Sequence, residues 1–165
     1  FTLVELLIVV AIMGILSAVG IVSYNGFIDR SQIAATRTNH TMIVNLVNAN
    51  SIRCRMGDEV DYLDTAGNSQ SFNCPTAIDQ FIRFMNEHVY GMNLLSPYGT
   101  PNGSWCRVNV TNCSPPGYMT ACPSNPDQLG YLSIFKSSSN TIKVCSNLEF
   151  TSGSIVYIEN SITFE

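Results

Sequence analysis

The sequence predicts an α+β protein in which one long N-terminal helix, half protruding and apolar, half packed, carries a globular head built on an antiparallel sheet. Three observations predict this fold. Residues 1–28 contain a single side chain that is charged at neutral pH, residues 29–56 keep a helical pattern with an apolar stripe, and the chain after residue 104 forms short β-rich segments. We therefore divide the chain into an apolar transmembrane helix, 1–28, and a head, 29–165.

The opening segment is apolar around its whole circumference, as in helices that are deeply buried or lie in a membrane. The 17 residues from Leu6 to Val22 carry no charge, and with residues 1–4 they approach the ~20 residues that cross a bilayer. A cleavable secretory signal is disfavoured because an initial Met, a basic start and a small-x-small cleavage site are missing. A plain anchor and a helix that later packs against copies of itself both stay as interpretations.

Glu5 is the one acidic side chain of this segment. An ionised group within an apolar helix costs on the order of 2.5 kcal/mol or more at bilayer depth, so it is normally paired. In a chain that starts at Phe1, the nearest positive charge is the α-amine of that residue. In one interpretation Glu5 reaches the lipid headgroups near the helix end. In the other, it is an assembly residue that neutralises the Phe1 amine of a neighbouring copy.

The opening resembles the N-terminus of type IV pilins and pseudopilins over about 28 residues, and the rest of the chain shows only general similarity to that family. The residues that carry the resemblance are Phe1, Thr2, Leu3, Glu5, the aliphatic run Ile8 to Ile12, Gly14, Ile15, Leu16, Ala18 and Tyr24.

The resemblance implies how the chain is processed and assembled. It implies that a prepilin peptidase removes a short leader at the inner membrane and methylates Phe1, and the lack of Met at position 1 fits such processing. It also implies a homopolymer of identical subunits, built by a pilus assembly machinery with a separate ATPase. In that filament Glu5 attracts the Phe1 amine of the adjoining subunit.

The function that we expect is therefore that of a major pilin, first in the bacterial inner membrane and then in an extracellular filament. The alternatives are a pseudopilin of a type II secretion system and a membrane-anchored binding module that never polymerises. The resemblance fits adhesion, twitching motility, DNA uptake and secretion equally. Catalytic motifs are absent from the sequence, no cofactor or metal is expected, and no basic block indicates a nucleic-acid site.

One departure from the family concerns Val22, where many members carry a helix-breaking proline. Glycine weakens a helix by ~1 kcal/mol relative to alanine, so we expect any melted segment near Gly14, Gly20 and Gly26. In the other interpretation, small residues serve close helix packing. Ala11, Gly14 and Ala18 share one helical face that lets backbones approach.

The segment 29–56 has no proline, and Met42, Ile43, Leu46 and Val47 form an apolar stripe. We expect a single helix from near Phe1 to about Arg55, roughly 80 Å long.

Residues 57–104 are expected to hold a loop and a second helix. Residues 57–73 are polar and read as a variable, solvated acidic loop. Thr76 is expected to open the helix and Gly91 to end it. Its apolar stripe is Ile78, Phe81, Ile82, Met85 and Val89.

The region 105–165 is expected to form the antiparallel sheet and its disulfide-rich loops. Short polar turns, including Glu159–Asn160, separate segments rich in β-branched and aromatic residues. These segments are Trp105–Val110, Tyr131–Phe135, Thr141–Cys145, Ser154–Ile158 and Ser161–Phe164.

Six cysteines in the head indicate an oxidising compartment and up to three disulfides. Fifteen pairings are possible, and we favour the sequential one: Cys54–Cys74, Cys106–Cys113 and Cys122–Cys145. A zinc site is disfavoured because no C-x-x-C pair occurs and the chain has two histidines, which we expect to be surface or packed residues.

Overall fold

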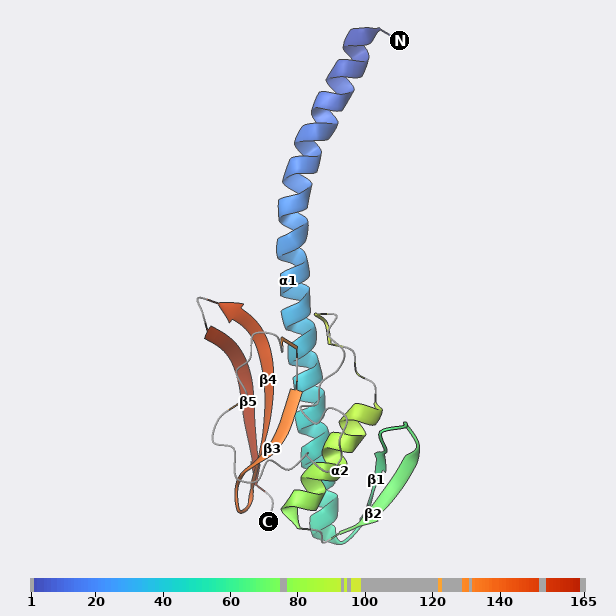
Figure 1. The fold of residues 1–165 in the computed structure, drawn as a ribbon, viewed down its shortest axis with the longest axis vertical. Helices are drawn as coiled ribbons and strands as arrows, with labels where there is room; N and C mark the ends of the chain where they lie inside the picture. The colour runs from blue at the N-terminus through green and yellow to red at the C-terminus, as the bar shows by residue number, and fades with distance from the viewer. Residues whose placement is uncertain are drawn as a thin grey trace.

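The computed structural model describes residues 2–74, 77–92, 94, 96–98, 122, 129–130, 132–151 and 154–163. It shows the expected α+β fold, with a long helix whose first half projects from a head of strands and one shorter helix (Figure 1). The elements are α1 (Leu3–Met56), β1 (Glu59–Leu63), β2 (Ser69–Asn73), α2 (Ile78–Gly91), β3 (Leu132–Ser138), β4 (Thr141–Thr151) and β5 (Ser154–Thr163).

The helix α1 runs without interruption for 54 residues, so the prediction of one long helix is confirmed. Its first turn is closed by a capping box between Thr2 and Glu5, and Gly57, with φ 79°, ends it in the left-handed conformation. The segment Gly14 to Gly26 stays helical in the single chain. The projecting half is gently curved (Figure 1).

The head packs against the second half of α1. The antiparallel sheet β3-β4-β5 lies on one side of this helix, and α2 lies between the helix, the sheet and the β1–β2 hairpin (Figure 1). The largest fully buried side chains come from all these layers, which makes them one core. Among them are Ile43 and Val47 from α1, Val60 from β1, Phe81 and Met85 from α2, and Ile142 and Val144 from β4.

Two loop and turn predictions are wrong. Residues 57–73 contain the hairpin β1–β2, in which Glu59 pairs with Asn73 and Leu63 with Ser69. The hairpin was missed because only Val60 and Phe72 of its strand residues are buried, too few to produce an apolar alternation. The pair Glu159–Asn160 lies within β5 and pairs with β4, so the two expected C-terminal segments are one strand.

The other elements agree with the sequence more closely. The strand β4 begins at the expected residue, Thr141, and β3 begins one residue later than expected, at Leu132. Both strands extend further toward the C-terminus than expected. The helix α2 starts at Ile78 after Ala77, which makes no side-chain cap, and all five expected stripe residues are buried. Thr76 and the expected strand Trp105–Val110 lie outside the described residues.

Candidate functional site

The projecting half of α1 is an exposed apolar surface. Every large apolar side chain described from Leu3 to Phe27 is exposed, with fractions between 44% at Val9 and 80% at Leu3. By length and composition, α1 is the one helix of the described chain that could cross a membrane, and none of its most apolar stretch is buried in the protein. A surface of this kind marks a membrane or protein contact.

Glu5 stands at the tip of this surface and has a local partner. Its Oε2 accepts a hydrogen bond from the backbone N–H of Thr2 at 2.8 Å, and its own N–H donates to Thr2 Oγ1 at 3.3 Å. The spacing T-x-x-E from Thr2 to Glu5 is the sequence signature of this capping box. Phe1, the expected methylation site and partner of Glu5, lies outside the described residues.

The small residues of this half have no role within the single chain. A Cβ atom built on Gly14, Gly20 or Gly26 meets no atom within 4 Å. Ala11 and Ala18 are exposed as well. Contacts within one copy of the protein therefore do not require small side chains here. Close packing between copies and local melting of the helix both stay predictions.

Two disulfides lie in the part of the head that the structure describes. Cys54 at the end of α1 is bonded to Cys74 after β2, and Cys122 is bonded to Cys145 in β4, with Cα–Cα distances of 4.9 and 5.8 Å. Both bonds confirm the sequential pairing where the structure describes it. Cys106 and Cys113 lie outside the described residues.

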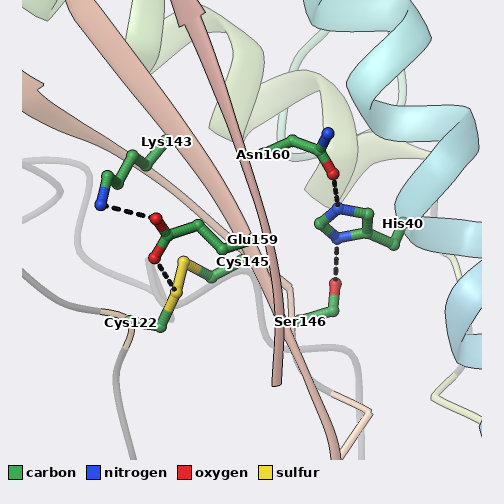
Figure 2. Close-up of a disulfide and its surroundings, with 7 residues drawn as sticks. All are labelled: His40, Cys122, Lys143, Cys145, Ser146, Glu159 and Asn160. Atoms are coloured by element: carbon green, nitrogen blue, oxygen red, sulfur yellow. Dashed lines mark hydrogen bonds and ion pairs between the residues drawn. A yellow bond between two sulfur atoms is a disulfide. The ribbon is translucent and has the colours of Figure 1, made fainter.

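The Cys122–Cys145 disulfide lies beside a charged pair on the outer side of the sheet. The Glu159 carboxylate is 2.7 Å from Lys143 Nζ and 3.2 Å from Cys122 Sγ (Figure 2). Glu159, Cys122 and Cys145 lie close enough to share a metal ion, but the disulfide uses both thiolates that such an ion would need.

The buried side chain of His40 links α1 to the sheet through hydrogen bonds. The sequence did not predict this link. The side chain is 3% exposed, with Nδ1 2.9 Å from Ser146 Oγ and Nε2 2.8 Å from Asn160 Oδ1 (Figure 2). Burial lowers the pKa of His40, which favours a neutral ring that donates to Asn160 and accepts from Ser146.

The strand geometry explains why neighbouring residues of β5 serve two sites. Successive side chains of a strand point to opposite faces of the sheet. Asn160 therefore reaches His40 on the helix side, while Glu159 reaches the disulfide on the other side (Figure 2).

Comparisons with family models, with curated proteins and with solved structures found no match to this chain.

Proposed function

We propose that this chain is the structural subunit of a surface filament of the type IV pilus kind. Residues 1–28 hold it in the bacterial inner membrane and then pack against the same residues of other copies. The observation that carries this proposal is the projecting half of α1, which is helical and exposes apolar side chains on all sides.

The energetics require a partner for this half. Burying one large aliphatic or aromatic side chain is worth about 2 kcal/mol, and this half exposes fifteen of them, from Leu3 to Phe27. Left in water, they would cost more than the ~5–15 kcal/mol by which a domain is stable. A bilayer satisfies them first and a bundle of identical helices afterwards, so one surface serves both states.

Glu5 supplies the direction of assembly in this proposal. Its capping bond to Thr2 keeps the carboxylate at the first turn, where it can meet an amine from another copy. The partner implied by the family resemblance is the methylated α-amine of Phe1 in the adjoining subunit. Pairing both charges removes the cost of an isolated ion in an apolar core.

The disulfides support an extracellular position for the head. Disulfides form and persist outside the reducing cytoplasm, and both described bonds are in the head. In this proposal the chain is first held in the inner membrane, where the prepilin peptidase processes it. The assembly machinery then builds it into a filament on the cell surface.

The experiment compares three variants of the full chain by filament yield: Glu5→Ala, Glu5→Gln and Thr2→Ala. If the Glu5 charge drives assembly, both Glu5 variants lose filaments, whereas Thr2→Ala, which breaks the capping box and keeps the charge, still assembles. Normal yield from Glu5→Gln, whose side-chain oxygen can still accept from the Thr2 N–H, would mean that Glu5 acts only as a helix cap. Normal yield from Glu5→Ala would refute the assembly role.

Electron microscopy of sheared filaments, with mass spectrometry of the subunit N-terminus, tests the wider proposal. We expect long filaments of this chain with a methylated Phe1 at its start. Short structures found only with a secretion system would favour a pseudopilin, and permanent monomers in the membrane would favour an anchored binding module. A native chain extending upstream of Phe1 would contradict the Glu5 pairing.

A further inference from the structure

The tip of the β1–β2 hairpin contacts the last turns of α2 through a histidine. The backbone N–H of Leu63, the last residue of β1, donates to His88 Nδ1 at 2.8 Å. Three residues later α2 has Gly91, where a Cβ atom would overlap the carbonyl oxygen of Asp64 and the Cβ of Leu63. The two elements are therefore packed too closely at this point for any residue but glycine.

This hydrogen bond exists only while His88 is neutral. A backbone N–H can only donate, so Nδ1 must offer a lone pair, and a protonated ring would direct a second N–H against the first. His40 differs, because the Ser146 hydroxyl that meets its Nδ1 can rotate from donor to acceptor. Of the two histidines in the chain, His88 is the one whose partner cannot adapt.

The charged groups near this contact are engaged elsewhere. Asp64, Arg83 and Glu87 are the charged residues that shift the pKa of Tyr62, the residue next to Leu63. The Asp64 carboxylate accepts from residues of its own turn, including the N–H of Asn68 at 2.9 Å. Arg83 and Glu87 pair at 3.1 Å. Burial of the ring is what lowers the pKa of His88.

The rest of the hairpin is held independently of His88. The disulfide Cys54–Cys74 fixes its base. Phe72 of β2 stacks on Phe84 with ring centroids 4.3 Å apart and meets Phe81 edge-on at 6.3 Å. Loss of the His88 bond would therefore loosen the tip, leaving its contact with Gly91, while the base and the middle stay docked.

We propose that His88 is a pH-sensitive latch for the hairpin tip, residues 63–68. The neutral ring holds the Leu63 amide, and protonation of the ring releases it. The latch is closed above the ordinary titration range of histidine and opens as the pH falls through and below that range. This device is independent of the filament proposal, since it needs only the folded head.

The test measures amide hydrogen exchange by NMR on the full chain in detergent, at about pH 7.5 and about pH 5. The protection factor of Leu63, corrected for intrinsic exchange, is compared with that of Val60 in the same strand. We expect acid to lower the ratio about tenfold, the value of roughly one hydrogen bond to this amide.

His88→Asn is the matched variant, because the asparagine Oδ1 can take the place of Nδ1 as acceptor and does not titrate. We expect this variant to keep the Leu63 amide protected at both pH values. His40→Gln should respond to acid as the natural chain does. An unchanged ratio in the natural chain, or an equal loss in His88→Asn, would overturn the proposal.

Discussion

The two halves of α1 share one backbone geometry and differ in what surrounds them. In residues 3–27 the side chains are mostly apolar, and every side chain that the structure describes there is exposed. In residues 29–56 one face is buried under the head, and this face is partly polar, with Thr36, His40 and Asn50 beside Ile43 and Val47. Helical conformation is therefore not what distinguishes them. The second half is stabilised by contacts within the chain, whereas the apolar surface of the first half is left exposed.

The same substitution, isoleucine to aspartate, made once in each half of α1 should give the largest difference in stability between the halves. Ile43 is fully buried and Ile12 is 52% exposed. Ile43→Asp should destabilise the head by about 4 kcal/mol or more, because it leaves a charge unpaired in the core. Ile12→Asp should leave the head intact and cost about 3 kcal/mol in the membrane. Thermal unfolding and membrane extraction measure the two effects, and equal loss of head stability would refute the contrast.

The disulfides should matter to the head alone. Removing Cys54–Cys74 by the paired change Cys54→Ser and Cys74→Ser opens a loop with a sequence separation of 20. The expected loss is about 3 kcal/mol in the free energy of unfolding. The pair Cys122–Cys145, with a separation of 23, is the matched control and should cost a similar amount. A change in membrane extraction of either variant would contradict the independence of the two halves.

Acid should also weaken the head and spare the projecting half, which has no histidine. Burial lowers the pKa of His40 below its ordinary value of 6.5, so the unfolded chain binds the proton more readily. Stability is therefore complete above about pH 6.5 and falls as the pH drops from there toward the lowered pKa. Thermal unfolding at a series of pH values tests this. His40→Gln should reduce the response without abolishing it, because burial also lowers the pKa of His88. A flat response in the natural chain would contradict the prediction.

The smallest expected effect concerns Gly14, and it separates the two interpretations of the small residues. Alanine and leucine both strengthen a helix relative to glycine, by up to ~1 kcal/mol, and the single chain has room for either Cβ atom. If Gly14 allows close packing between copies, Gly14→Leu should reduce filament yield while Gly14→Ala is tolerated. If Gly14 is a point of melting, both variants should assemble poorly.

The parts of the head that sequence failed to predict are those positioned by contacts with residues distant in the sequence. The hairpin β1–β2 has two buried strand residues, and its position comes from the aromatic contacts of Phe72 and from the Cys54–Cys74 bond. The polar pair Glu159–Asn160 resembles a turn, but each side chain has a partner on its own face of the sheet. Partners distant in sequence leave no local pattern.

The long helix, its apolar first half and the stripe of α2 were predictable from the sequence, because they follow from composition and from a 3.6-residue period. It also favoured the disulfide pairing that the described residues confirm. The folded chain was needed to show that His40 links α1 to β4 and β5 and that His88 accepts a hydrogen bond from the Leu63 N–H. The physical reason is that periodicity reports which face is buried, whereas a hydrogen-bond partner depends on where another element, up to 120 residues away, comes to lie.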